Sequence, residues 1–157
     1  MDGVPPVPKH PSEQRAITDV QEYGWHIIHV GSDSLGAGWS FSIGLFHTFR
    51  HPEFIIMGLP SATTQLLINE LGARVKAGEH FAHRQRDPDV LTSYEVQFVS
   101  VSQAAYRDHL GYACWFYRGE RFPVLQVVWP DRAGIFPWQA GFDPSLVSVE
   151  PVLGVAT

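Results

Sequence analysis

The segment Gly36–Pro60, GAGWSFSIGLFHTFRHPEFIIMGLP, decides the fold that we expect. Its first part, Trp39–Ile43, alternates large apolar residues with serines, which is typical of a β-strand. Its last part, Glu53–Leu59, is apolar without alternation, which indicates a strand covered on both faces. A polar corner, His47–Glu53, lies between them, and Pro52 disfavours helical geometry for the residue before it. The segment therefore predicts two strands joined by a turn.

The rest of the chain supplies further helices and strands around this pair. Periodicity and capping residues predict helices over residues 12–24, 61–78 and 102–119, and strands over residues 25–30, 94–101 and 123–129. Residues 79–88 are expected to form a polar connector, and residues 135–138 a short strand or flap. Only two connections between strands can hold a crossover helix. We therefore expect an α+β fold: a curled, mostly antiparallel sheet or small barrel with two to three packed helices.

Composition and charge limit the classes of protein to which this chain can belong. Of the 157 residues, 45% are hydrophobic and 17% are charged, which suits one domain with a sizeable core. We expect residues 1–11 to form a flexible, proline-rich arm and residues 12–157 a single globular domain. The formal net charge of −5 argues against a nucleic-acid partner or an anionic membrane surface, since both require a basic face. No apolar run is long enough to span a membrane, and Cys114 is the single cysteine, so we expect a cytoplasmic protein.

The corner holds the side chains best suited to chemistry. His47 and His51 are candidate catalytic bases, because an imidazole titrates near neutral pH. Arg50 between them can hold a carboxylate or phosphate at two points. Asp131, after the strand that ends at Trp129, is a candidate acid or base that we expect at the same end of the sheet. Each has a structural alternative: the histidines can fix the turn, Arg50 can be solvated, and Asp131 can cap a turn.

Aromatic side chains could form the walls of a ligand site beside this corner. Trp39, Trp129 and Trp138 lie near predicted strand ends, where they build either core or the rim of a ligand site. His26 on the first strand is a further candidate ligand-binding residue. A metal site would need a third ligand besides the two histidines of the corner, so no metal is predicted. The cofactor, if there is one, is unknown.

Four stretches of the chain carry a family resemblance. They are GWHIIHV (24–30), WSFSIGLFHTFRHPEFIIMGLP (39–60), LLINELGARVKAGE (66–79) and FPVLQVVWPDRAGIFPW (122–138). Together they resemble the bacterial family known as domain of unknown function 4262, over about residues 22–142. Phe41 and Ser42 stand where the family usually has Tyr-Thr. The resemblance implies a bacterial cytosolic protein in which the corner and the Gln126–Asp131 strand end are family features, and it implies no substrate.

Three hypotheses for function follow. The first is a small-molecule-binding domain, or an enzyme that uses the His/Arg corner for acid–base chemistry on an anionic or aromatic ligand. The second is a split-barrel protein that binds a flavin or haem, by analogy of fold alone. The third is a non-enzymatic interaction module that forms a homodimer.

Overall fold

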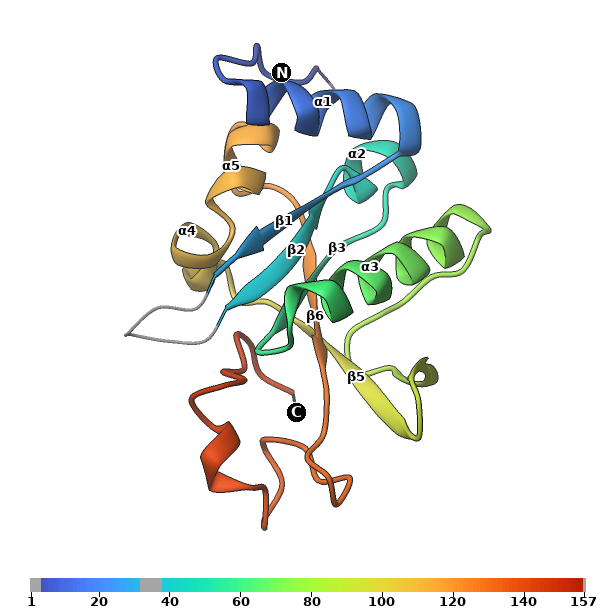
Figure 1. Cartoon of the computed structure of the whole chain (residues 1–157), viewed down its shortest axis with the longest axis vertical. Helices are drawn as coiled ribbons and strands as arrows, with labels where there is room; N and C mark the ends of the chain where they lie inside the picture. Colours follow the sequence, from blue (N-terminus) through green and yellow to red (C-terminus); the bar gives the residue numbers. More distant parts are fainter. Residues whose placement is uncertain (1–3, 32–37, 157) are drawn as a thin grey trace.

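A six-stranded sheet runs through the centre of the computed structural model, which describes residues 4–31 and 38–156 (Figure 1). The strands follow the order β1-β2-β3-β6-β5-β4. Their bounds are β1 His26–Val30, β2 Trp39–Ile43, β3 Glu53–Met57, β4 Arg86–Leu91, β5 Tyr94–Ser100 and β6 Val124–Val128. Neighbours are antiparallel except β3 and β6, which run parallel. The predicted α+β fold with a curled, mostly antiparallel sheet is confirmed.

The described strands form an open sheet, because β1 and β4 are its two edges and do not pair with each other. Of the two forms that we expected, the structure therefore has the curled sheet and not the small barrel. The hypothesis of a split-barrel protein that binds a flavin or haem rests on the curled antiparallel sheet with inserted helices, and it stays a prediction.

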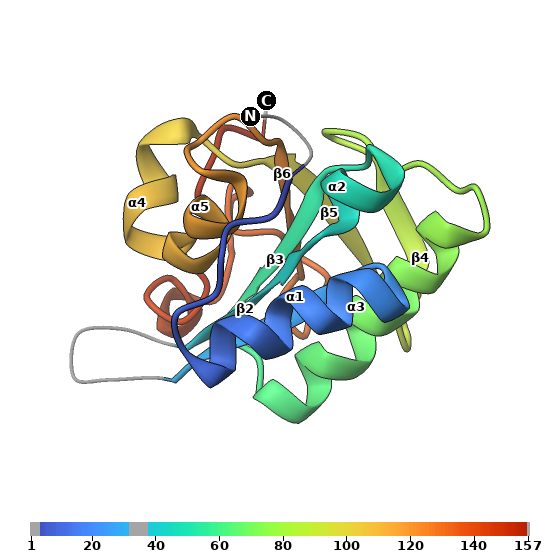
Figure 2. The same cartoon turned by 90° about the horizontal axis from the view of Figure 1, so that it is seen from above.

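Helices cover both faces of the sheet (Figures 1 and 2). They are α1 Pro11–Tyr23, α2 Leu45–Phe49, α3 Ser61–Lys76, α4 Tyr106–His109 and α5 Gly111–Tyr117, with short 3-10 turns η1 Gln103–Ala105 and η2 Pro144–Leu146. The helix α3 and the α4–α5 pair lie on opposite sides of the sheet (Figure 2), and α1 packs in the same core cluster as α4 and α5. Among the described residues, no helix combines the length and apolar character needed to cross a membrane.

The central strand β3 is buried over its whole length, as its unbroken apolar run predicts. Phe54 and Ile56 point to the α3 face and pack in one core cluster with that helix. Ile55 and Met57 point to the other face and pack in the cluster that includes residues of α1, α4 and α5. The two clusters hold the polar residue at the start of this strand, Glu53, completely away from solvent.

The C-terminal segment extends the cover on the α1/α4/α5 face beyond the helices. The side chain of Gln126 in β6 donates to the carbonyl of Pro151 at 2.9 Å and accepts from the N–H of Leu153 at 2.8 Å. Phe136 packs with the same segment in a third small cluster. Residues 135–138 therefore form neither the strand nor the flap that we expected, because the tail already covers this part of the sheet.

Three local elements differ from the prediction. The corner contains the helix α2 instead of a turn, because Pro52 restricts only His51, and the helix has ended by then at Phe49. The strand β4 begins inside the expected polar connector; it carries Pro88, which an edge strand tolerates. The helix predicted over residues 102–119 divides at Leu110, where the backbone leaves helical geometry between α4 and α5.

Candidate functional site

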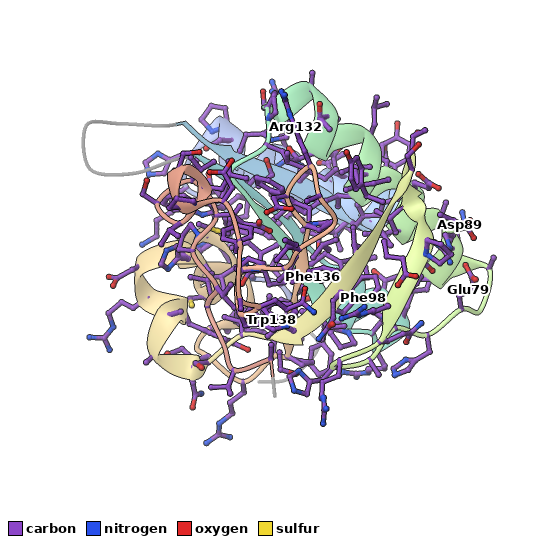
Figure 3. All side chains as sticks on the ribbon, turned by 90° about the horizontal axis from the view of Figure 1, so that it is seen from below. Glu79, Asp89, Phe98, Arg132, Phe136 and Trp138 are labelled. Atoms are coloured by element: carbon purple, nitrogen blue, oxygen red, sulfur yellow. The ribbon has the colours of Figure 1, made fainter. Side chains whose placement is uncertain are left out.

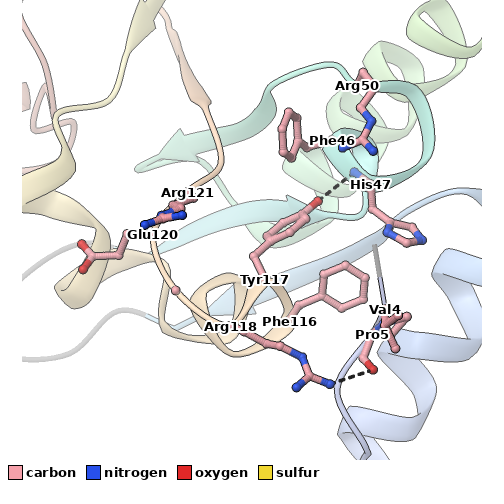
Figure 4. Close-up of a pocket in the computed structure, with 11 residues that line it drawn as sticks. Val4, Pro5, Phe46, His47, Arg50, Phe116, Tyr117, Arg118, Glu120 and Arg121 are labelled. Carbon is pink, nitrogen blue, oxygen red and sulfur yellow. Dashed lines mark hydrogen bonds between the residues drawn. The ribbon is translucent and has the colours of Figure 1, made fainter. Parts of the chain in front are cut away.

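A cleft of about 510 Å³ opens between α2 and the end of α5 (Figure 4). Its basic side chains come from two segments that are far apart in the sequence: His47 and Arg50 from α2 and its end, and Arg118 and Arg121 from the residues after α5. Aromatic rings form much of the remaining wall, and they belong to Phe46, Phe116 and Tyr117. A cavity of this size can hold a small organic molecule.

The α2 side of the cleft contributes an imidazole and a guanidinium. The His47 ring is half-buried and meets the Phe116 ring edge-on, with 5.7 Å between centroids. Burial lowers the pKa of His47, and the charge of Arg50 lowers it further. The guanidinium carbon of Arg50 lies 5.5 Å from the centroid of the Phe46 ring. His47 is therefore a neutral proton acceptor at physiological pH, next to a fixed positive charge.

Arginines cap both helices of the cleft in an unusual backbone conformation. Arg50 follows α2 and Arg118 follows α5, each with a φ of 57°, in the left-handed region that favours glycine. Such a residue costs on the order of 1–2 kcal/mol relative to ordinary geometry. Each cation lies at a helix C-terminus, where the backbone carbonyls favour positive charge. The same left-handed geometry occurs at Arg84 and Ser93, which do not line the cleft, so it ends the two helices and does not by itself mark a binding site.

The buried carboxylate of Glu53 fixes the position of α2. It accepts hydrogen bonds from the backbone N–H groups of Gly44 at 2.9 Å, Leu45 at 3.1 Å and Phe46 at 3.2 Å, which are the free donors at the start of that helix. The hydroxyl of Ser42 donates to it at 2.7 Å. Burial raises the pKa of Glu53, and these donors act against the rise. The last residue of the corner thus acts as the N-terminal cap of the helix that carries His47.

The hydroxyl of Tyr117 joins the two sides of the cleft. It donates to the Glu53 carboxylate and accepts from the backbone N–H groups of Gly44 and His47, each at 3.2 Å. Burial and the Glu53 charge raise the pKa of Tyr117, so the phenol keeps its proton. The ring stacks on Phe122 with 4.6 Å between centroids. Tyr117 therefore ties α5, and the arginines that follow it, to α2.

His51 lies outside the cleft, although it is close to His47 in the sequence. It is 2% exposed. Its Nδ1 lies 2.8 Å from the carbonyl oxygen of Pro52, and its Nε2 accepts from the N–H of Phe81 at 3.0 Å. Since a carbonyl only accepts, Nδ1 carries the proton. Both ring nitrogens are hydrogen-bonded to the backbone. The imidazole of His51 therefore has a structural role, because it holds the loop that follows α3.

Asp131 lies at the opposite end of the sheet from His47. Because β3 and β6 are parallel and Glu53 pairs with Val124, the corner lies where both strands begin, whereas Asp131 follows the end of β6. The expectation that these residues share one end is therefore wrong. The Asp131 carboxylate accepts from three backbone N–H groups, and the bond from Ile135 contributes most to lowering its pKa. It organises the turn after β6.

The tryptophans do not surround the cleft. The indole N–H of Trp129 donates to the carbonyl of Met57 at 2.8 Å inside the α3 core. Trp138 lies parallel to Phe136, 5.1 Å between centroids, next to the C-terminal segment (Figure 3). Trp39 donates to the carbonyl of His109 at 2.8 Å and lines a different cavity. Of the predicted site residues, the structure brings only His47 and Arg50 together.

His26 belongs to a separate groove between α1, β1 and α3. Its Nδ1 lies 2.7 Å from a carboxylate oxygen of Asp19. The groove also takes in Trp25 and Tyr23, and none of its residues lines the cleft of His47. Within residues 4–31 and 38–156, no group of three His, Cys, Asp or Glu side chains is arranged to hold a metal ion.

Sequence reasoning missed the α5 side of the cleft. The segment Trp115-Phe116-Tyr117-Arg118-Gly119-Glu120-Arg121 places two arginines directly after three aromatic residues. That pattern indicates a flat, cationic surface, but the helix expected over residues 102–119 takes in most of this segment. The pairing of this segment with α2 depends on β3 and β6 being parallel neighbours, which local patterns do not reveal.

Fold and site together define a class: an α+β domain with a cationic, aromatic-walled cleft between a short helix and the end of another. The chain belongs to the DUF4262 family, a domain of unknown function whose family model matches residues 19–143. The match includes both helices of the cleft and leaves out Val4 and Pro5, which complete its rim. No curated protein and no solved structure matches the chain.

Proposed function

We propose that the cleft between α2 and α5 binds a small anionic molecule that also carries a flat or apolar part. The observation that supports this proposal is that three arginines, Arg50, Arg118 and Arg121, line one cavity with a single acid, Glu120, in a chain whose formal net charge is −5. Guanidinium groups bind phosphate and carboxylate groups through paired hydrogen bonds. The rings of Phe46 and Phe116 offer an apolar surface beside these cations.

His47 gives the same cleft a group able to accept a proton. Its pKa is lowered by burial and by Arg50, so the neutral imidazole is the form present at physiological pH. A ligand whose anionic group contacts Arg50 would hold its neighbouring atoms close to this ring. We therefore propose His47 as the general base of the site and Arg50, Arg118 and Arg121 as its anion-binding residues.

Ligand-dependent stabilisation provides the test. Inorganic phosphate, sulfate, benzoate and a nucleoside monophosphate are added separately while the melting temperature is followed, and binding is then measured by calorimetry. A ligand that binds only the folded state raises stability by RT ln(1 + [L]/Kd). Loss of a hydrogen bond to a charged group costs about 1.5–3 kcal/mol, so R50Q and R121Q should each weaken binding roughly 10- to 100-fold.

Arg107 supplies the matched control. It is exposed on α4 and does not line the cleft, so R107Q makes the same change in net charge without touching the site. Binding by R107Q should equal that of the unmodified protein. Equal losses in R107Q and R50Q would show a general charge effect, and no stabilisation by any of the four anions would contradict the proposed function.

A further inference from the structure

A further cavity, of about 420 Å³, lies beside the β1–β2 pair and the start of α3. Its lining includes His29, Trp39, Ser40, Leu59 and Pro60. Among the described residues that line it, His29 is the single titratable side chain. This cavity is separate from the cleft of Arg50 and lacks its arginines. It suits a neutral, largely apolar molecule.

Ser40 and His29 form a bonded pair in this cavity. They lie directly opposite each other on β2 and β1, and the Ser40 Oγ is 2.6 Å from the His29 Nδ1. The His29 Nε2 lies 2.7 Å from the Gln65 Oε1 on α3. Since an amide oxygen only accepts, Nε2 donates to it, and Nδ1 can accept the proton of the serine hydroxyl.

The hydroxyl of Ser40 is also held from the helix side. The Thr64 Oγ1 in the first turn of α3 lies 2.6 Å from the Ser40 Oγ and 3.1 Å from the carbonyl oxygen of Ser61. Ser40 is 2% exposed, and Thr64 is fully buried. The serine is thus held between Thr64 and His29 and shielded from bulk water, and its proton points to His29 when Thr64 donates to Ser40 in place of the Ser61 carbonyl.

We propose that Ser40, His29 and Gln65 form a catalytic site for small, neutral esters with an apolar acyl group. Ser40 is the nucleophile, His29 the general base, and Gln65 a positioning residue that fixes the ring of His29. An activated hydroxyl, a hydrogen-bonded base and an orienting group are three of the parts that acyl transfer uses. Trp39, Leu59 and Pro60 provide apolar contacts for the acyl group.

The reaction balances as an ester hydrolysis. The Ser40 Oγ attacks the ester carbonyl carbon while its proton moves to His29 Nδ1, and the carbonyl oxygen takes the negative charge. The carbonyl then re-forms, the bond to the alcohol oxygen breaks, and the alcohol leaves with the proton from His29. Water, deprotonated by His29, attacks the acyl-serine and releases the carboxylic acid, and the proton returns to Ser40. The overall change is ester plus water to acid plus alcohol.

An active-site label tests the proposal on the folded, full-length protein. A small alkyl fluorophosphonate should modify Ser40 of the unmodified protein, as shown by peptide mass mapping, and should not label it in urea. Loss of a general base slows such a step by about 10²- to 10⁴-fold, so H29Q should label at least about 100-fold more slowly. S100A removes an exposed serine at the end of β5 and should label at the unmodified rate.

Substitutions of Gln65 can test catalysis without disturbing the packing, because this side chain is exposed and its replacement should leave the fold intact. Q65A should slow labelling of Ser40 and the hydrolysis of p-nitrophenyl butyrate, and Q65E should restore both, because a carboxylate also accepts the proton of Nε2. Absence of label on Ser40 in the folded protein would overturn the proposal, as would equal labelling of H29Q. In either case the three side chains are a structural network, and the anion cleft is unaffected by that result.

Discussion

The Tyr117 hydroxyl donates a hydrogen bond to the Glu53 carboxylate, and this contact joins the two sides of the cationic cleft. Glu53 caps the helix that carries His47, and Tyr117 ends the helix that Arg118 follows. Neither side chain presents a charge to the cleft. Their bond instead sets the separation between the imidazole of His47 and the arginines on the far side, so the geometry of the site depends on it.

Removing that hydroxyl should loosen the cleft. The variant Y117F keeps the ring that stacks on Phe122, and it takes away one donor to Glu53 and one acceptor for the N–H groups of Gly44 and His47. Leaving buried partners unpaired costs about 1–3 kcal/mol. We expect a loss of that size in urea-induced unfolding, together with weaker binding of the best anion identified for the cleft.

Tyr106 provides a matched control for this prediction. Its hydroxyl is also buried, and it donates to the carbonyl of Phe122 at 2.6 Å without lining the cleft. Y106F should lose a comparable amount of stability and bind the anion as before. If the two variants lost affinity equally, the hydroxyl of Tyr117 would have no particular role in the cleft.

Gly44 makes the start of α2 possible. Its φ is 109°, and a Cβ at this position would lie 2.7 Å from the Val20 side chain. Gly78 has a similar φ of 105° but nothing within 4 Å of an added Cβ. G78A should therefore cost about 1–2 kcal/mol from backbone strain alone, and G44A about 2–5 kcal/mol from strain plus overpacking. Equal unfolding free energies for the two variants would show that α1 adjusts freely.

Protonation of His47 should strengthen anion binding. Its pKa in the free protein is lowered from 6.5 by burial and Arg50, and a bound anion favours the imidazolium form. Affinity should therefore rise as the pH falls below 6.5 through the pKa of His47. Sulfate is the suitable probe, because its own charge is constant over this range. Calorimetry should show the rise in the unmodified protein and in H80Q, whereas H47Q should show a flat profile. A rise that persists in H47Q would assign the titration to another group.

The strands of the sheet could be predicted because each carries its own periodic signal. The alternation of Trp39–Ile43 and the apolar run of Glu53–Leu59 correctly predict β2 and β3, although the serines of β2 are buried and β3 ends at Met57. Edge strands carry weaker signals. Only two residues of the strand β4 are buried, and the strand includes Pro88, so its sequence resembles a connector. Its strand geometry comes from pairing with β5.

The candidate site was only half predictable, because its two sides meet through a non-local contact. His47 and Arg50 could be identified from the corner alone. Arg118 and Arg121 join them because Glu53 binds Tyr117, which lies 64 positions further along the chain. The direction of β6 relative to β3 also decided where Asp131 lies, and no local pattern specifies whether two apolar strands run parallel or antiparallel.

Glu150 is a buried acid that no candidate site uses. It is 1% exposed, and its Oε1 accepts from the N–H of Trp129 at 2.8 Å. Its Oε2 has no hydrogen-bond partner within the part of the chain that the structure describes. Burial raises the pKa of Glu150 from 4.5 to about 9, against the effect of the bond from Trp129. The folded protein therefore holds this group as a neutral acid at physiological pH.

The neutral state of Glu150 predicts how stability depends on pH. Between 4.5 and about 9 the folded state keeps a proton that the unfolded chain has lost, so this group makes stability fall as the pH rises. The slope for one proton is about 1.4 kcal/mol per pH unit. The side chain introduced by E150Q resembles the neutral acid in shape and cannot ionise. In urea unfolding at pH 8, E150Q should therefore be more stable than the unmodified protein. The difference in stability should shrink towards pH 4.5. E70Q changes an exposed glutamate on α3 and should follow the unmodified protein at every pH. Parallel curves for E150Q and the unmodified protein would mean that Glu150 is ionised in the fold, with its second oxygen bound to a group such as an ordered water.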